Sequence, residues 1–213
     1  VWTRLSRADG VLSQAVDFAF HDKYGYLSAA LSEVGTGFRL FGVMHLPGLA
    51  MSNRILAESE KAAKSGHRVE GFFGPVSEGL GEVFIASNTA TLGRSEEEIQ
   101  FNLRHLVSSL LEGEHQSRQH LLSEGTRALE DRVGRAAGLA KGARLLEFAE
   151  GLGILSSLRL GFAMGQLKDF SYKQLNYALY ASQPAHLAMR AGQDCDELTL
   201  SMERADLFRS IFS

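Results

Sequence analysis

The sequence predicts an α+β protein in which a partial antiparallel sheet is flanked by helices and followed by an all-helical region. Two observations carry the prediction. Short β-prone apolar runs, separated by glycine-rich breakers, are confined to the first part of the chain. After residue 123 the apolar patterns all have the spacing of a helix. We therefore expect one domain at residues 1–122 and a helical domain at residues 123–213.

Composition and charge narrow the class of protein. With 213 residues, of which 45% are hydrophobic, the chain can bury a sizeable core. With a net charge of −3, the chain lacks the excess of basic residues that is typical of nucleic-acid-binding proteins. No apolar run is long enough to span a membrane.

The single cysteine, Cys195, excludes an intrachain disulfide framework, so we expect a cytoplasmic protein. The histidines show no metal-ligand spacing, so we predict no protein-bound metal. Because the chain opens on Val1 rather than methionine, we interpret it as a fragment of a longer protein.

A glycine loop stands between two β-prone runs early in the chain. Residues 26–31 and 38–46 are apolar, and the breaker cluster at 32–37 separates them, which predicts a hairpin with a wide tip. Two glycines that flank a threonine allow positive φ and a close approach of the backbone to a ligand. Arg39, just past them, could direct its guanidinium at an oxyanion such as phosphate. The alternative is an ordinary hairpin loop with a surface arginine, and spacing alone favours that alternative.

The other elements follow from apolar spacing and from capping residues. In the first region we expect helices at 11–20 and 49–64 and strands at 69–73 and 82–86. A long helix is expected to begin at Ser95, because Ser95 and Glu98 have the spacing of a capping box. Its apolar stripe should lie across a face of the sheet. In the second region the expected helices are 129–146, 152–167, 172–181 and 198–211.

Several segments together resemble the catalytic domain of the ATP:guanidino phosphotransferases. They are Val34-Gly35-Thr36-Gly37-Phe38-Arg39, His45-Leu46-Pro47 and the run from Ser87 to Glu96. Within that family the chain is most similar to the bacterial protein arginine kinases, whose helical C-terminal region is matched by Asp131-Arg132-Val133 and by Leu158-Arg159-Leu160-Gly161. The resemblance implies the C-terminal portion of a phosphagen-kinase-like catalytic domain, then a helical C-terminal domain.

The resemblance also implies phosphoryl transfer from ATP, with Mg²⁺, to the guanidino group of protein arginine. In the family, ATP lies on an antiparallel sheet and arginines clamp its phosphates. The first nucleotide stretch matches Arg39, Leu40, Phe41, Gly42 and Val43, and Arg39 matches one of the clamping arginines. The second nucleotide stretch matches Glu70, Gly71, Phe72, Phe73, Gly74 and Pro75.

Departures from the family pattern imply impaired catalysis. Glu70 stands where the family carries an arginine, so an anion replaces a cation beside the polyphosphate. Pro75 replaces a glutamate thought to hold the substrate guanidinium, and Ala30 replaces a reactive cysteine. No catalytic residue is retained, and a family-like sheet would need further strands from upstream residues, which predicts an exposed sheet edge. We also expect Glu70 to lie beside Arg39 and to form a salt bridge with it that weakens ATP binding.

The helical region carries the remains of a second family site. Arg204 and Ala205 match the second half of a motif that binds phosphoarginine, while Leu200 and Ser201 replace the first half. The plainer interpretation of Arg204 is a surface arginine in a terminal helix.

Two functions stay open: a truncated and impaired protein-arginine-kinase-like phosphotransferase, or a non-catalytic pseudokinase that serves as a regulatory or dimerisation module. We expect protein substrates or regulatory protein partners, a homo-oligomer through the helical region, and no nucleic-acid or membrane partner.

Overall fold

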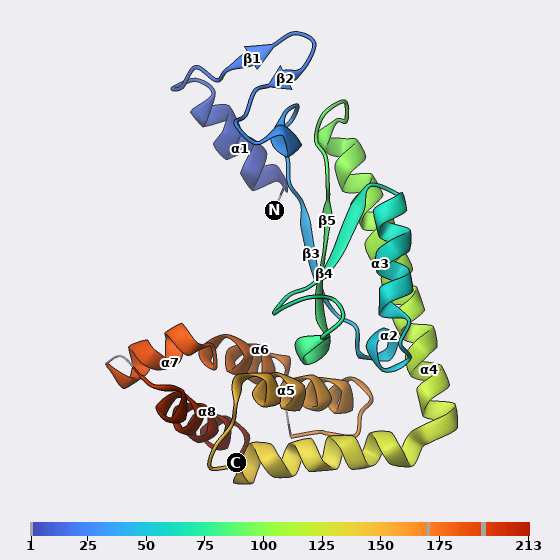
Figure 1. Cartoon of the computed structure of the whole chain (residues 1–213), viewed down its shortest axis with the longest axis vertical. Helices are drawn as coiled ribbons and strands as arrows, with labels where there is room; N and C mark the ends of the chain where they lie inside the picture. The colour runs from blue at the N-terminus through green and yellow to red at the C-terminus, as the bar shows by residue number, and fades with distance from the viewer. Residues whose placement is uncertain (1, 170, 193–194) are drawn as a thin grey trace.

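The computed structural model describes residues 2–169, 171–192 and 195–213, and it has three parts along its long axis (Figure 1). An N-terminal arm, residues 2–27, lies at one end. A small sheet backed by helices lies in the middle, and a helical bundle forms the other end. The arm contains α1 (Trp2–Leu12), β1 (Phe20–His21) and β2 (Gly25–Tyr26). Helices and antiparallel strands together confirm the α+β class.

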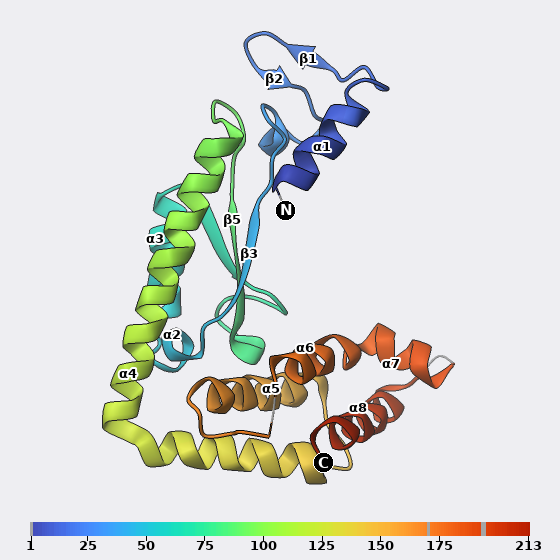
Figure 2. The ribbon, with the colours of Figure 1, turned by 180° about the vertical axis from the view of Figure 1, so that it is seen from behind.

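The central sheet has the strand order β3-β5-β4, and both pairs are antiparallel. Its strands are β3 (Phe41–His45), β4 (His67–Gly71) and β5 (Val83–Asn88). Helices cover one face only, with α3 and the first half of α4 on the same side of the sheet in both views (Figure 2). On that side Met44, Val69 and Phe84 join a core with Leu103 and Leu110 of α4. The other face is open, since Phe41 and Val43 are both exposed.

The expected hairpin is wrong. Strand β3 pairs with β5, more than 35 positions further along the chain, and not with residues 26–31. Residues Leu31–Glu33 instead form a short 3₁₀ helix, η1. Tyr26 of the first run instead bridges to Gly35 of the breaker cluster, through hydrogen bonds between their backbones. The long-range pairing prevails because it buries the inner side chains of β3 against the helices, which a local hairpin in the arm would leave exposed.

The helices that flank the sheet differ from the expected ranges. The helix expected at 11–20 is wrong, because α1 ends at Leu12 and Phe20 pairs with Tyr26 in the arm. The helix expected at 49–64 is two helices, α2 (Pro47–Met51) and α3 (Ile55–Lys64), separated where Asn53 takes a φ of 55°. Glu114 of α4 accepts hydrogen bonds at 2.9 Å from the first amides of α2, so α2 is tied to α4 rather than continuous with α3.

The longest helix, α4 (Glu96–Gly142), connects the sheet to the bundle. It begins with the expected capping box, because Ser95 accepts from the Glu98 amide and the Glu98 side chain accepts from the Ser95 amide. It bends at Gly125, whose φ and ψ are −148° and 37°. The helix expected at 129–146 is therefore the second half of α4. The division at residue 122 stays a prediction, because α4 runs through it.

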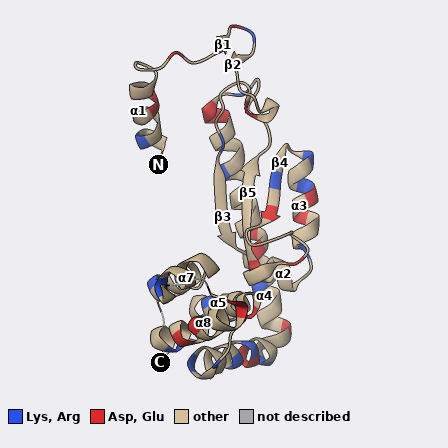
Figure 3. Ribbon diagram, turned by 60° about the vertical axis from the view of Figure 1, so that its left-hand side comes forward, with Lys and Arg blue, Asp and Glu red and all other residues tan. Residues whose placement is uncertain are grey.

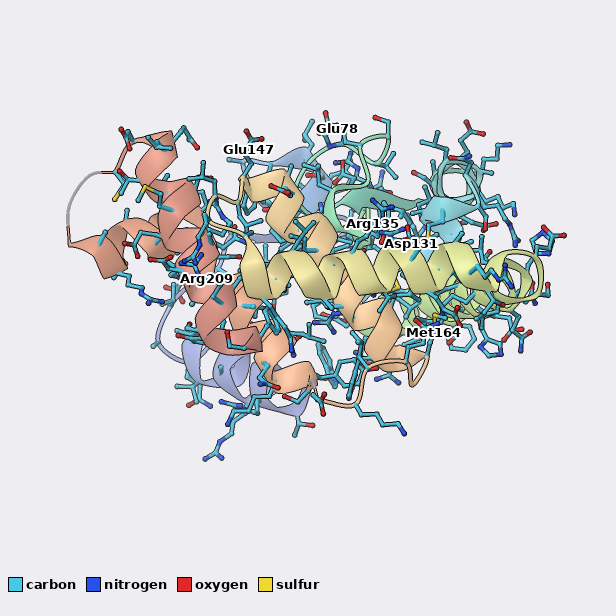
Figure 4. All side chains as sticks on the ribbon, turned by 90° about the horizontal axis from the view of Figure 1, so that it is seen from below. Glu78, Asp131, Arg135, Glu147, Met164 and Arg209 are labelled. Atoms are coloured by element: carbon cyan, nitrogen blue, oxygen red, sulfur yellow. The ribbon has the colours of Figure 1, made fainter. Side chains whose placement is uncertain are left out.

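The bundle packs the second half of α4 against four further helices. They are α5 (Phe148–Ala163), α6 (Tyr172–Ala181), α7 (Pro184–Ala191) and α8 (Glu197–Phe212), of which α7 was not predicted. Leu158 of α5 and Phe208 of α8 lie fully buried in the core that these helices share with α4. The outer face of α4 is exposed, and Figure 4 shows Asp131 and Arg135 on it, joined by an ion pair of 2.7 Å.

None of the described helices has the length and apolarity needed to cross a membrane.

A polar network joins the sheet to the bundle. Glu82, in the short 3₁₀ helix η2 (Leu80–Glu82) before β5, accepts a hydrogen bond of 2.8 Å from Arg132 of α4. Arg132 also donates to Ser157 of α5 at 2.9 Å. His45, at the end of β3, is hydrogen-bonded through Nε2 to Ser156 Oγ at 2.7 Å, and Ser156 donates to Glu82. The last residue of β3 is thus connected to the helical bundle.

Candidate functional site

The open face of the sheet carries a row of three side chains from its three strands. Phe41 of β3 and Arg68 of β4 both pair with Ser87 of β5. Directly paired residues project to the same side of a sheet. Phe41 and Arg68 are exposed, whereas Val69, which points the other way, is buried against the helices. The row Phe41, Ser87, Arg68 therefore faces outward, with the aromatic ring and the guanidinium on either side of a serine.

Arg39 lies beside this row, just before β3 begins. Its guanidinium carbon is 5.9 Å from the centre of the Phe41 ring, which places it on the open side. Its Nε is buried and has no hydrogen-bond partner among the described residues. Because this Nε is enclosed, a phosphate oxygen on the open side would accept hydrogen bonds from the Nη groups of Arg39 rather than from Nε. The geometry of Arg39 therefore fits a phosphate group.

The side chain of Asn88 positions Arg39. Its Oδ1 accepts from the Leu40 amide at 2.9 Å, and its Nδ2 donates to the Phe38 carbonyl at 3.0 Å. Both peptide groups that flank Arg39 are thus held by one buried amide at the end of β5. Reasoning from the sequence gave Asn88 no role of its own. Its position within the run from Ser87 to Glu96 was the only signal.

The expected salt bridge between Arg39 and Glu70 is wrong. Strand β5 lies between the two residues, and Glu70 instead forms an ion pair of 3.6 Å with Arg68 on its own strand. Figure 3 shows the basic and acidic positions following one another along β4. In the register of the sheet Glu70 pairs with Ile85, one row further from Arg39 than Arg68 is. The cation of β4 nearest to Arg39 along the open face is therefore Arg68.

The other expected nucleotide residues lie in three places. Leu40 packs on the core, and a Cβ at Gly42 would lie 3.1 Å from Val107 of α4, so both face the helices. Val43 and Glu70 form the next outward row with Ile85. The remaining residues, Gly71, Phe72, Phe73, Gly74 and Pro75, form the chain reversal at the far end of β4. Whether any of these residues binds ATP stays a prediction.

The turn after β4 contacts the helical bundle. A Cβ at Gly71 would lie 2.4 Å from the Gly74 carbonyl oxygen, so the tight reversal requires glycine there. The ring of Phe73 packs edge-on against Phe148 of α5, with centroids 5.7 Å apart. Pro75 follows this turn and is far along the sheet from Arg39. The second expected stretch therefore lies mostly away from the cationic end of the open face.

The residues present do not fit a metal ion. In the ranges that the structure describes, no group of three or more histidine, cysteine, aspartate or glutamate side chains is placed to hold one. The acidic side chain on the open face, Glu70, is already paired with Arg68. No residue in the described ranges is therefore assigned to Mg²⁺.

Arg204 is a core residue, and its interpretation as a surface arginine is wrong. It is 1% exposed, its Nε donates to the Ser182 carbonyl at 3.1 Å, and its Nη1 donates to the Leu146 carbonyl at 2.7 Å. Its guanidinium carbon lies 5.6 Å from the centre of the Phe148 ring. Burial lowers the pKa of Arg204. Ala205 is fully buried beside it, so both side chains hold the bundle together.

His45 is neutral in the folded protein. Burial, and after it the positive charges of Arg159 and two further arginines, lower the pKa of His45 to about 3. The ring is partly buried at the end of β3 and bonded to Ser156. A neutral imidazole fixed in this way serves the junction between the sheet and the bundle.

Comparison with known proteins agrees with this architecture. Residues 1–117 match the ATP:guanido phosphotransferase C-terminal catalytic domain, and residues 126–213 match the protein-arginine kinase McsB C-terminal domain. The chain therefore belongs to the ATP:guanido phosphotransferase family.

The relatives described next are all protein-arginine kinases. The protein-arginine kinase of Symbiobacterium thermophilum is 37% identical over 212 residues, which cover 100% of this chain and 60% of the relative. That of Clostridium kluyveri is 38% identical over 203 residues, covering 95% of this chain and 59% of the relative. That of Listeria monocytogenes is 34% identical, with 95% and 60% covered. The chain thus spans about 60% of the length of these protein-arginine kinases.

Proposed function

We propose that this chain is a protein-arginine-kinase-like phosphotransferase, catalytically impaired, that binds ATP on the open face of its sheet. The observation that carries the proposal is Arg39. Its guanidinium lies beside the exposed Phe41 ring, at the end of the face where Arg68 supplies a second cation. Two guanidinium groups match the charge and the forked geometry of a polyphosphate. The similarity to protein-arginine kinases supports arginine as the acceptor.

The chemistry assigned to these residues is positioning and charge neutralisation. Phosphate oxygens would accept hydrogen bonds from Arg39 and Arg68, and the exposed ring of Phe41 would contact the nucleotide between them. ATP supplies the phosphoryl group when it is bound. Among the described residues, the open face offers no unpaired carboxylate that could accept a proton from the attacking guanidinium, because Glu70 is paired with Arg68. Slow or absent turnover follows from that lack.

The alternative is a non-catalytic pseudokinase that acts through other proteins. One observation favours it: the bundle exposes several large apolar side chains on α6, α7 and α8. They are Tyr177, Tyr180, Met189, Leu198 and Met202. Exposed apolar surface favours association with a second copy or with a regulatory partner. Light scattering across a range of protein concentrations tests for a homo-oligomer, and a monomer at all concentrations would contradict dimerisation through this region.

Two measurements test the proposed function. Calorimetric titration with ATP should show binding to the wild type that is lost in Arg39→Gln and retained in Arg190→Gln, an exposed arginine of α7 far from the sheet. Transfer of labelled phosphate to an arginine-rich protein then separates the two functions. Turnover that depends on Arg39 supports the phosphotransferase, and ATP binding without turnover supports the pseudokinase. Failure of the wild type to bind ATP would contradict the nucleotide site itself.

A further inference from the structure

Glu82 lies just before β5 and has a strained backbone. Its φ is 52°, in the left-handed region that residues other than glycine seldom adopt. Such a conformation persists only where the surrounding structure enforces it, and it commonly marks a position with a function. The Glu82 carbonyl also accepts a hydrogen bond of 2.9 Å from the Leu46 amide, next to the end of β3. Glu82 therefore fixes the adjoining ends of two strands of the sheet.

The helical bundle holds the side chain of Glu82. Arg132, in the second half of α4, donates to one carboxylate oxygen at 2.8 Å, and Ser156 of α5 donates to the other. Arg132 is fixed in turn, because it also donates to Ser157 at 2.9 Å. The Glu82 side chain is only 13% exposed, and hydrogen bonds to an ionised group are the stronger kind. The bundle thus supplies the contacts that keep Glu82 in its strained conformation.

Strand β5 connects Glu82 to the other end of the sheet. It is the central strand, paired with β3 on one side and with β4 on the other. A slip of one residue would turn its inner side chains to the open face, so β5 keeps its register and its neighbours move with it. Figure 1 shows β5 running from the bundle towards the N-terminal arm. At that far end Asn88 bonds to the peptide groups on both sides of Arg39.

We propose that Glu82 is a positioning residue of the nucleotide site, which fixes the place of Arg39 through β5 and Asn88. Glu82 is about 20 Å from Asn88 along the strand, so it does not touch a nucleotide bound at Arg39. The proposal rests on the proposed function, to which it adds a dependence of the nucleotide site on the helical bundle. Contacts with the bundle keep β5 in the orientation that presents Arg39. Without them the turn at Glu82 relaxes, and the segment that carries Arg39 loses its fixed position.

Hydrogen exchange of the Leu40 amide tests the proposal without nucleotide. This amide donates to Asn88, so its exchange rate reports on the segment that carries Arg39. Glu82→Gly removes the carboxylate and leaves a residue that adopts the same φ without strain, whereas Arg132→Gln removes the guanidinium donor and leaves the Glu82 backbone unchanged. Each should accelerate Leu40 exchange about threefold to tenfold. Exchange at the wild-type rate in either folded variant would overturn the proposal.

Matched controls separate positioning from a general loss of stability. Arg135→Gln is the control for Arg132→Gln, since Arg135 follows Arg132 on α4, is exposed, and pairs with Asp131 rather than with the sheet. It should leave Leu40 exchange and ATP affinity unchanged. The amides of α3, recorded in the same spectra, should exchange at wild-type rates in all variants. Equal acceleration in α3 and at Leu40 would show a general destabilisation and would overturn the proposal.

ATP titration measures the consequence for binding. Glu82→Gly and Arg132→Gln should each weaken ATP binding about threefold to tenfold, and Arg132→Lys, which keeps a cation beside Glu82, should weaken it less. In an Asn88→Ala background Glu82→Gly should cost little further, because Arg39 has already lost its support. Weakening by the same factor in both backgrounds would overturn the route through β5.

The outcome is separable from that of the proposed function. Leu40 exchange is measured without nucleotide, and ATP binding is measured on the wild type and on Arg39→Gln. A protein that binds ATP through Arg39 but shows no effect of Arg132→Gln on Leu40 exchange keeps its nucleotide site and contradicts only the role of Glu82. A protein in which Leu40 exchange depends on Arg132, and which does not bind ATP, retains the positioning of the Arg39 segment and contradicts the phosphotransferase.

Discussion

Asn88 holds both peptide groups that flank Arg39, one as a hydrogen-bond acceptor and one as a donor. The side chain that does this is 1% exposed, so it is fixed by the core at the end of β5. Arg39 lies just before β3, outside the regular strand, and these two hydrogen bonds fix the position of its backbone. The position of the candidate phosphate-binding guanidinium therefore depends on a buried residue of the neighbouring strand.

The first prediction concerns this amide. Asn88→Ala should lower the free energy of unfolding by about 1–3 kcal/mol, because the Leu40 amide and the Phe38 carbonyl lose their partner in a partly buried place. ATP affinity should fall as well, since Arg39 loses its support. Urea denaturation and calorimetry measure the two effects. Asn102→Ala on α4 is the control, and it should leave ATP affinity unchanged.

A second prediction concerns the ion pair on β4. Glu70→Gln should strengthen ATP binding about twofold to tenfold, because it removes an anion from the open face and releases Arg68 from its partner. Arg68→Gln should weaken binding by a similar factor. Both side chains are more than half exposed, at 55% and 59%, so stability should hardly change. Titration at two salt concentrations measures the effect, which should shrink at high salt. Equal ATP affinity in Arg68→Gln and the wild type would show that Arg68 is no part of the site.

A third prediction concerns pH. The pKa of His45 is lowered to about 3 in the folded protein, whereas an unfolded histidine titrates near 6.5. Below about pH 6.5 the unfolded chain therefore gains a proton that the folded chain does not, and stability is lost as the pH falls towards 3. This group should contribute a slope of at most about 1.4 kcal/mol per pH unit.

His45→Gln tests the origin of that slope. Glutamine can still bond to Ser156 but does not titrate, so the free energy of unfolding should depend less on pH between 6.5 and 4 than in the wild type. His67, whose pKa is also lowered by burial, is present in both proteins and does not affect the difference. His120→Gln is the control, because His120 is exposed on α4. Identical pH profiles for wild type and His45→Gln would contradict the buried neutral histidine.

A fourth prediction concerns Arg204. Arg204→Ala should destabilise the protein by about 3–5 kcal/mol, because it leaves two buried carbonyl oxygens without donors and opens a cavity beside Phe148. Thermal melting or urea denaturation measures the loss. Arg190→Ala, an exposed arginine, should change stability by less than about 0.5 kcal/mol. If Arg204→Ala lowered the free energy of unfolding by as little as Arg190→Ala does, Arg204 would not be the buried structural residue described above.

Prediction from sequence succeeded where local chemistry decides the structure. The capping box of Ser95 and Glu98 starts α4 as expected, and the helix expected at 172–181 has those bounds in the structure. The strands expected at 69–73 and 82–86 lie within two residues of β4 and β5. Each signal consists of residues a few positions apart, so the sequence shows it directly.

Prediction failed where residues far apart in the chain compete. The hairpin at 26–46 was plausible locally, yet β3 pairs with β5, and the arm takes residues 20–26. Because β5 rather than a neighbouring run pairs with β3, Glu70 lies away from Arg39 and pairs with Arg68. The burial of Arg204 depends on Ser182 and Leu146, 22 and 58 positions away. None of these contacts leaves a pattern in the local sequence.

The sequence by itself determined the α+β class, the family and the helical character of the second region, because apolar spacing and family motifs are local properties. The tertiary structure alone decided which residues share the open face of the sheet. Strand order and register set the neighbours of each side chain, and they follow from burying the inner faces of three strands against α3 and α4. Arg39 therefore lies at the same end of the open face as Arg68 and is held by Asn88, 48 positions from Leu40, through contacts that only the folded chain makes.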